Sequence, residues 1–102
     1  MILHLPLKKK WFYLIDYQIK REEYREIKPY WIKRLLEYAW EEGETPYVFD
    51  HMVKPIEAIH FRDGYSKKVI VKKFKKLKIG KPNPEWCEPG DENKKVFIIE
   101  FE

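Results

Sequence analysis

The chain has 102 residues, and its 21 Lys and Arg residues exceed its 17 Asp and Glu residues, so the formal net charge is +4. With 44% hydrophobic and 17% aromatic residues it can bury a small core, which excludes a disordered chain and predicts a single domain over residues 1–102. The one cysteine, Cys87, excludes an intramolecular disulfide and a zinc site made of thiolates.

Neither a membrane segment nor an export signal is visible in the sequence. The longest early stretch without charge or proline, residues 11–15, is far too short to span a bilayer. The basic residues at the N-terminus follow the apolar ones, which is the reverse of the order in a signal peptide. We therefore expect a cytoplasmic protein with no membrane contact. Many Lys and Glu residues beside few uncharged polar ones are typical of hyperthermophile proteins, although an AT-rich genome also favours lysine.

The first half of the chain predicts one strand and two helices, with an ambiguous segment between the helices. Residues 2–7 alternate and predict a short strand, and residues 8–19 carry apolar side chains at helical spacing. Residues 19–27 are almost all charged, so periodicity alone does not decide between a continued helix and a strand. Pro29 then begins a second helix, which we expect to end near Gly43.

The second half predicts strands. Residues 56–61 alternate and are followed by the turn signal Asp63-Gly64. Residues 67–81 predict a long, bent strand with an irregularity between Val71 and Leu77, because Phe74 falls on the opposite parity. Residues 80–90 have the composition of a loop, and residues 96–101 predict a central strand that is apolar on both faces. This order predicts an α+β fold in which about five or six strands close into a small mixed β-barrel flanked by two helices.

Residues 18–25, QIKREEYR, match the signature G-x-K-x-x-E-x-R of ASCH domains, which are PUA-like. Lys20, Glu23 and Arg25 fill the three polar positions, and Gln18 stands where the family has glycine. The chain resembles a small bacterial and phage branch of this family over nearly its whole length. The further blocks that carry the resemblance are KPYW at 28–31, FRDGY at 61–65 and NPEW at 83–86.

The resemblance implies a PUA-like barrel with a cleft lined by the motif, and it implies that residues 21–26 form a strand. It also implies binding of RNA or nucleotides, because the family is thought to bind them. Some members resemble ribonucleases, and others are amidohydrolases that act on acetylated cytidine. In the amidohydrolases a threonine stands where this chain has Glu23.

The charges of the motif support a cleft on physical grounds. Two residues apart on a strand, Glu23 and Arg25 project from one face, and Lys20 at the strand's entrance can lean over the same face. Charges inside a barrel have to be paired, since a lone buried charge is costly. Fixed cations suit a phosphate or a base carbonyl, and the carboxylate can accept from the exocyclic amine of cytosine or adenine. Alternatively, the same pattern marks an exposed edge strand that discourages aggregation.

Other side chains could extend such a site. Tyr24, Tyr65 and Trp86 could stack on a base, although packing against the protein is the commoner role of a single aromatic side chain. Arg62 could reach a phosphate or equally pair with Asp63 or Glu57. The eight lysines of residues 67–81 read either as a track for phosphates or as a solvated face. The three histidines show no metal-ligand spacing, and no cofactor motif is present, so we expect neither a metal nor a cofactor.

Three functions remain open at the level of sequence. The first is binding of RNA or a modified nucleotide through Lys20, Glu23 and Arg25. The second is an enzyme that hydrolyses a nucleoside amide or RNA, with Lys20 as base and Glu23 as proton shuttle. The third is a protein-interaction domain that uses an aromatic, lysine-rich surface. The oligomeric state cannot be read from the sequence.

Overall fold

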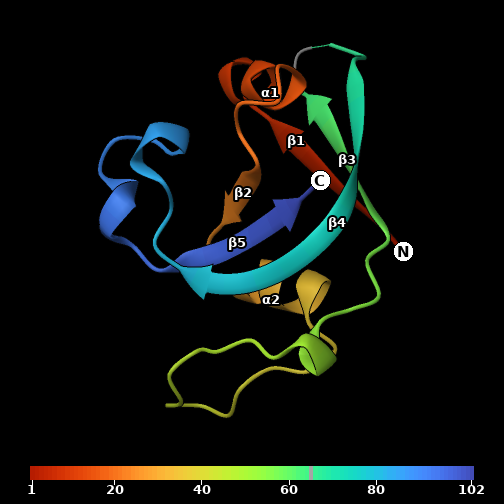
Figure 1. The fold of residues 1–102 in the computed structure, drawn as a ribbon. Coiled ribbons are helices and arrows are strands. Elements are labelled where there is room, and N and C mark those ends of the chain that lie inside the picture. The colour runs from red at the N-terminus through yellow and green to blue at the C-terminus, as the bar shows by residue number, and fades with distance from the viewer. Residues whose placement is uncertain (65) are drawn as a thin grey trace.

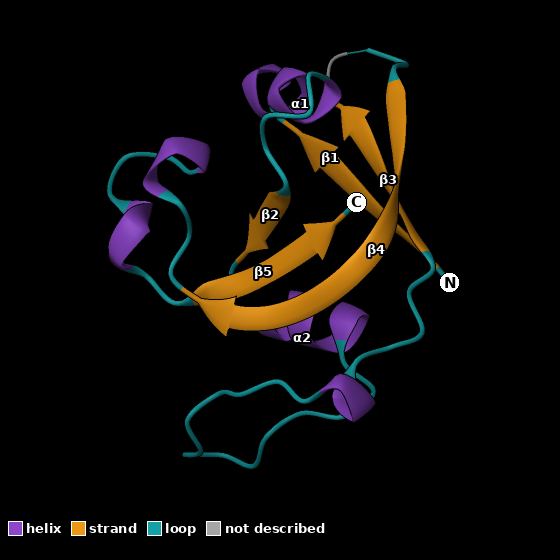
Figure 2. Cartoon of the chain, viewed as in Figure 1, coloured by secondary structure: helices purple, strands orange, loops and turns teal. Residues whose placement is uncertain are grey.

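The computed structural model describes residues 1–64 and 66–102 as an α+β fold of five strands and two α-helices (Figures 1 and 2). Tyr65 lies outside the described residues. Three short 3₁₀-helices cover residues 50–52, 84–86 and 91–93. The elements are β1 (Ile2–Leu7), α1 (Lys9–Asp16), β2 (Glu22–Arg25), α2 (Pro29–Leu35), β3 (Ala58–Asp63), β4 (Val69–Gly80) and β5 (Val96–Phe101).

The strands form one mixed sheet in the order β1-β3-β4-β5-β2. The pair β1–β3 is parallel, and the other three pairs are antiparallel. The long strand β4 pairs with β3 through its first half and with β5 through its second half, and Figure 1 shows it curving around the molecule. The register shifts between Phe74 and Lys76, which confirms the irregularity predicted from the parity of the apolar residues.

The sheet is open between its two edge strands. A closed barrel is predicted from the sequence, but within the described residues β1 and β2 do not pair. Pro6 in β1 has no N–H to donate, and its carbonyl accepts a hydrogen bond from the Arg25 guanidinium at 3.0 Å. A side chain of β2 therefore bridges to β1 where a barrel would have a backbone ladder.

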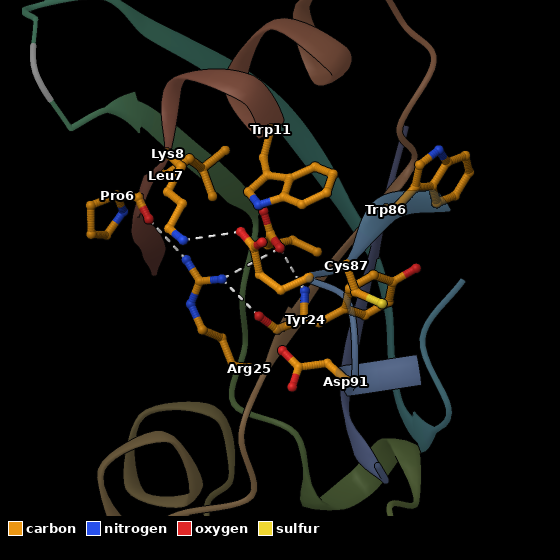
Figure 3. A pocket seen from close by; sticks show the side chains of 11 residues that line it. Pro6, Leu7, Lys8, Trp11, Tyr24, Arg25, Trp86, Cys87 and Asp91 are labelled. Atoms are coloured by element: carbon orange, nitrogen blue, oxygen red, sulfur yellow. Dashed lines mark hydrogen bonds and ion pairs between the residues drawn. The ribbon is translucent and has the colours of Figure 1, made fainter. Parts of the chain in front are cut away.

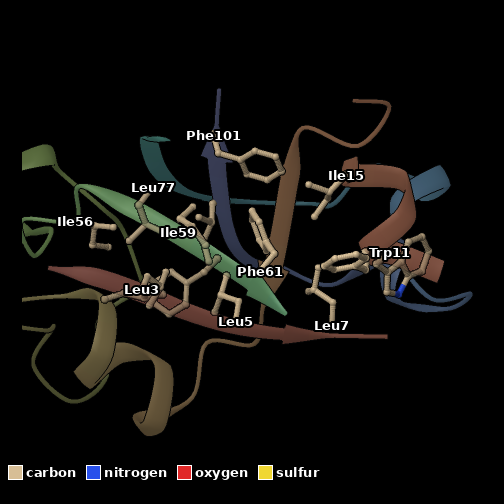
Figure 4. Packing of buried hydrophobic residues seen from close by; sticks show 14 of the residues in the cluster. Leu3, Leu5, Leu7, Trp11, Ile15, Ile56, Ile59, Phe61, Leu77 and Phe101 are labelled. Carbon is tan, nitrogen blue, oxygen red and sulfur yellow. The ribbon is translucent and has the colours of Figure 1, made fainter. Parts of the chain in front are cut away.

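The core fills the concave side of this curled sheet (Figure 4). Leu3, Leu5 and Leu7 alternate inward from β1, and β5 is buried on both faces, as the sequence predicts. Helix α1 packs against the sheet with the buried side chains of Trp11 and Ile15, among others. No helix of residues 1–64 and 66–102 is long and apolar enough to cross a bilayer.

The predicted extent of the second helix is wrong, because α2 ends at Leu35 instead of near Gly43. Leu36 adopts an extended conformation, is buried and bridges to Val53, so burying this apolar pair against the core overrides the local preference for helix. The chain then returns Trp40 to the core, where its ring stacks on Phe97. Two smaller differences are the end of α1 at Asp16 and the shift of β3 to residues 58–63.

Candidate functional site

The turn after α1 brings Lys20 to the interior. Gln18 has a φ of 61°, and the N–H groups of Gln18 and Ile19 donate to the carbonyls of Ile15 and Leu14. This pattern is a Schellman motif, which ends a helix with one residue in the left-handed region. The left-handed residue occupies the position where the ASCH signature has glycine. The chain reverses here, and Lys20 enters the space beneath α1.

Lys20 is fully buried, and its ammonium is saturated. Nζ donates to the carbonyl of Glu22 at 2.8 Å, to the carbonyl of Trp86 at 3.1 Å and to Oε1 of Glu23 at 3.2 Å. These three contacts use all three N–H donors of a lysine. The rings of Trp11 and Tyr24 lie 5.3 and 4.6 Å from Nζ. Burial lowers the pKa of Lys20, and the Glu23 carboxylate opposes that effect.

Glu23 has one oxygen in use and one free. Its Oε1 accepts from the backbone N–H of Tyr24 at 2.8 Å and from Lys20, and it lies 3.5 Å from a guanidinium nitrogen of Arg25. Its Oε2 is buried and has no hydrogen-bond partner among the described residues. A carboxylate oxygen accepts hydrogen bonds readily, and leaving one unmade in the interior costs about 1–3 kcal/mol or more. The site therefore holds an unmet acceptor.

Arg25 is largely buried and closes one side of the site. One guanidinium nitrogen donates to the carbonyl of Tyr24 at 2.7 Å, and the other donates to Pro6. The Trp31 ring lies 5.2 Å from the guanidinium carbon. Burial lowers the pKa of Arg25 and Glu23 opposes the shift, yet a guanidinium stays protonated at neutral pH. With five N–H donors, Arg25 keeps donors for a further acceptor.

These residues line a cleft of about 230 Å³ between β1, β2, α1 and the loop that follows β4 (Figure 3). Trp11, Tyr24 and Trp86 supply aromatic surface to it. At its rim, Lys8 forms an ion pair with Glu88 at 3.0 Å, and Asp91 pairs with Lys94. Lys20 lies under the floor and does not line the cleft itself. The charged side chains that line the cleft are the cations Lys8 and Arg25 and the carboxylates Glu23, Glu88 and Asp91. With the buried Lys20 beneath the cleft, the positive and negative charges are equal in number.

Tyr24 fastens the loop after β4 to strand β2. Its hydroxyl donates to Glu22 at 2.7 Å and accepts from the backbone N–H of Asn83 at 3.0 Å. Burial, and then the hydrogen bond to Glu22, raise the pKa of Tyr24 above its ordinary value of 10. Together with the bond from Lys20 to Trp86, this contact holds the loop over the cleft.

The structure brings together most, but not all, of the residues predicted from the sequence. Lys20, Glu23 and Arg25 cluster as predicted, and Tyr24 and Trp86 join them. Arg62 does not, because β3 turns it outward into a separate hollow with His4 and His60. Alternation along β3 causes this, since Phe61 and Asp63 point inward. The predicted role of Tyr65 falls outside the described residues.

Several cleft residues were not predicted as part of the site. Lys8 and Trp11 come from the start of α1, and Glu88 and Asp91 come from the loop. Nothing in their local sequence marks them, since only the path of the chain brings them near β2. Cys87 also lines the cleft, where burial, and then nearby carboxylates, raise its pKa and keep the thiol protonated.

Within residues 1–64 and 66–102, no group of three or more His, Cys, Asp or Glu side chains could hold a metal ion. His4 and His60 lie edge to face on the outer surface of β1 and β3, 5.1 Å apart between ring centroids.

Comparisons with protein-family models, with curated proteins and with solved structures find no match to this chain.

Proposed function

We propose that the cleft binds a nucleobase with an exocyclic amine, cytosine or adenine, presented by RNA or by a nucleotide. The observation that carries this proposal is the unpartnered Oε2 of Glu23, buried in a cleft that Arg25 also lines. A ligand that donates one hydrogen bond to Oε2 and accepts one from the guanidinium would satisfy both groups. The Watson–Crick edges of cytosine and adenine place an amine beside a ring nitrogen that accepts, which is that combination, whereas uracil flanks its one ring N–H with two carbonyls, one of which would face the carboxylate.

The charge and shape of the cleft favour a base over a phosphate. Because its cations and carboxylates balance, the cleft has little net attraction for a phosphate dianion, whereas a neutral base needs only matched donors and acceptors. Its volume of about 230 Å³ is below the roughly 300–1,000 Å³ of sites for drug-sized ligands, so it suits one flat ring system. The indole and phenol rings on its walls offer stacking surface.

The resemblance to ASCH domains points in the same direction. The left-handed backbone at Gln18, where the signature has glycine, and the curled sheet bridged by Arg25 are both compatible with a PUA-like barrel. We include that assignment in the proposal.

Hydrolysis is less well supported by the contacts of Lys20. A general base needs a free lone pair facing the substrate, but Nζ donates to three protein acceptors and lies beneath the cleft. Lys20 instead positions Glu23 and the loop at Trp86. Binding without turnover is therefore the function that the geometry supports best.

The proposal is tested by titrating the protein with cytidine, adenosine, uridine and guanosine monophosphates while following the indole N–H signals by NMR. We expect cytidine and adenosine monophosphates to shift the signals of Trp11 and Trp86, and uridine monophosphate to bind at least tenfold more weakly. Glu23→Gln should abolish this preference because an amide presents a donor as well as an acceptor.

Glu85→Gln is the matched control, since Glu85 is an exposed glutamate of the loop after β4 and does not line the cleft. Arg25→Lys is a second test that keeps the charge and removes the planar donor fork. If none of the four nucleotides shifts the tryptophan signals at millimolar concentration, the proposed function is wrong.

A further inference from the structure

A second hollow of about 510 Å³ lies between α2 and the N-terminal half of β1. Figure 4 shows this end of β1 beside α2. Lys33, Arg34 and Lys54 line it together with the exposed ring of Tyr30, and no Asp or Glu of the described residues does so. We call it the α2 groove. Unlike the balanced cleft, the groove carries an uncompensated positive charge.

The α2 groove is joined to the cleft by a series of cations and aromatic rings. From the cleft, the Arg25 guanidinium carbon lies 5.2 Å from the Trp31 ring, and that ring meets Tyr30 edge to face at 4.9 Å. The Arg34 guanidinium carbon then lies 4.4 Å from the Tyr30 ring. Strand β1 runs beside this series, with Pro6 and Leu7 at the cleft and residues 2–4 at the groove. Its six residues span about 20 Å at roughly 3.3 Å per residue.

The free edge of β1 is poorly suited to receive a peptide strand. The carbonyls of Met1 and Leu7 accept hydrogen bonds from residues 57 and 64, so the odd-numbered residues face β3. The outer edge is left to the backbone groups of Ile2, His4 and Pro6. Pro6 lacks an N–H and Arg25 takes its carbonyl, so an added strand would find only two residues to pair with.

We infer that the α2 groove binds the sugar-phosphate backbone of a single-stranded nucleic acid whose amine-bearing base occupies the cleft. Lys33, Arg34 and Lys54 contact phosphates, and Tyr30 with Arg34 offers a stacking surface for a flanking base. This inference rests on the proposed function and extends it from a nucleotide to an oligonucleotide. The two hollows have different roles. The balanced cleft selects a base, and the groove, which has no acidic lining residue in the described chain, attracts the phosphates.

A comparable hollow beside β4 is a weaker candidate. Its charged lining residues are four cations and one carboxylate, and no Trp or Tyr of the described residues lines it: Lys20, Arg21, Lys72, Lys75 and Glu102. It also carries net positive charge, but it contains a carboxylate that would face a phosphate, and it lacks the exposed aromatic ring of the α2 groove.

The test compares cytidine monophosphate with oligocytidylate RNA and DNA of 12 nucleotides, measured by NMR and by fluorescence anisotropy. The groove variant is Lys33→Gln/Arg34→Gln/Lys54→Gln. Its control is Lys67→Gln/Lys76→Gln/Lys95→Gln, which removes the same charge from exposed lysines outside the groove. Circular dichroism and thermal unfolding establish that both variants fold.

We expect the wild-type protein to bind at least one of the two 12-mers ten times or more tightly than the monophosphate. The groove variant should lose at least tenfold in 12-mer affinity and retain its monophosphate affinity. Its salt dependence should fall by about two in log–log slope, since each phosphate contact to a single strand contributes roughly 0.7. The control should stay within threefold of the wild type.

Each other outcome has one meaning. If the monophosphate binds but neither 12-mer binds more tightly, the inference is wrong and the proposed function stands. Equal losses of 12-mer affinity in the groove and control variants would mean that the basic residues attract the 12-mer through a diffuse positive field. That result would also overturn the inference. Tighter binding of a 12-residue poly-glutamate peptide, lost in the groove variant, would assign the groove to a protein partner instead. If neither the monophosphate nor a 12-mer binds, the proposed function and the inference both fail.

Discussion

Gln18 adopts a backbone conformation that glycine adopts far more easily. A side chain at a φ of 61° brings Cβ close to the following carbonyl, which costs roughly 1–2 kcal/mol for a residue other than glycine. The Schellman hydrogen bonds of Gln18 and Ile19 compensate for this strain by closing the end of α1. The strained turn at Gln18 has a structural role, because the chain reversal that it makes places Lys20 in the interior.

Gln18→Gly is therefore expected to stabilise the protein. The substitution removes the strain of about 1–2 kcal/mol but raises the entropy of the unfolded chain by roughly 0.5–1 kcal/mol, so a net gain of about 0.5–1 kcal/mol should remain. Urea unfolding measures the difference. Gln18→Ala, which keeps Cβ, is the control and should bring no gain. A lower stability for the glycine variant would contradict this account of the turn.

Tyr24 predicts a dependence of stability on alkaline pH. Its pKa in the folded protein is raised, first by burial and then by Glu22, while the unfolded value is about 10. A raised pKa contributes stability that is complete below pH 10 and is lost as the pH rises above 10, because the unfolded chain then ionises more readily. The advantage of the wild type over Tyr24→Phe should thus shrink above pH 10.

At pH 7, Tyr24→Phe should cost about 1 kcal/mol, because it leaves the Asn83 N–H without its acceptor. Urea unfolding at pH 7, 9 and 10.5 gives both quantities. Tyr17→Phe, at a largely exposed tyrosine, should follow the wild type at every pH. Parallel curves for the wild type and Tyr24→Phe would rule out the proposed linkage.

The clustering of Lys20, Glu23 and Arg25 could be predicted from the sequence because their spacing and charge constrain one another. Charges on one short strand of a buried sheet have to meet their partners nearby. The contributions of Lys8, Trp11 and Glu88 could not be predicted, since they depend on how α1 and a loop some 80 residues further along approach each other. Arg62 is predicted from its charge to reach a phosphate, but the alternation of β3 turns its side chain away from the cleft.

At the scale of elements, the strands were more predictable than the helix ends. The alternating apolar residues of β1 fit a strand with one buried face, and the nearly continuous apolar run of β5 fits a strand buried on both faces. In β4 the change in parity of the apolar residues marks the register irregularity directly. Helix α2 was predicted about eight residues too long because its continuation has good helical propensity. The competing contact, Leu36 with Val53, joins residues that no local window contains.

The loop after β4 is held by two side chains of the β2 region, which predicts a local effect of Lys20→Met. This change removes the donor to the Trp86 carbonyl and leaves Glu23 with one cation fewer. Breaking a buried ion pair in this way costs roughly 3–5 kcal/mol. Amide exchange should accelerate most in residues 81–93 and less in the β3–β4 ladder.

Lys81→Met is the control for that experiment, because Lys81 is an exposed lysine of the same loop. The double variant Lys20→Met/Glu23→Gln should lose less free energy of unfolding than the two single variants lose together, since it leaves no carboxylate without its partner. Uniformly faster exchange across the protein would show that Lys20 supports the whole core and not the loop.

At the scale of the whole molecule, the open sheet depends on a side chain to join its edges. The order β1-β3-β4-β5-β2 places the first two strands of the chain at opposite ends of the sheet. No local pattern predicts that arrangement, which follows from the parallel pairing of β1 with β3. Arg25 spans the gap by bonding to Pro6 from β2, and it also contacts Glu23 and Trp31.

Arg25→Met therefore tests how much the bridge between the edges contributes. Methionine keeps an apolar stem but leaves the carbonyls of Pro6 and Tyr24 without donors, so we expect a loss of about 2–4 kcal/mol in the free energy of unfolding. Arg21→Met, at an exposed arginine just before β2, should change it by less than about 0.5 kcal/mol. Equal effects of the two substitutions in urea unfolding would mean that the edges are held by the core alone. A selective loss for Arg25 would show that one residue serves both purposes, since the guanidinium that joins β2 to β1 also lines the cleft.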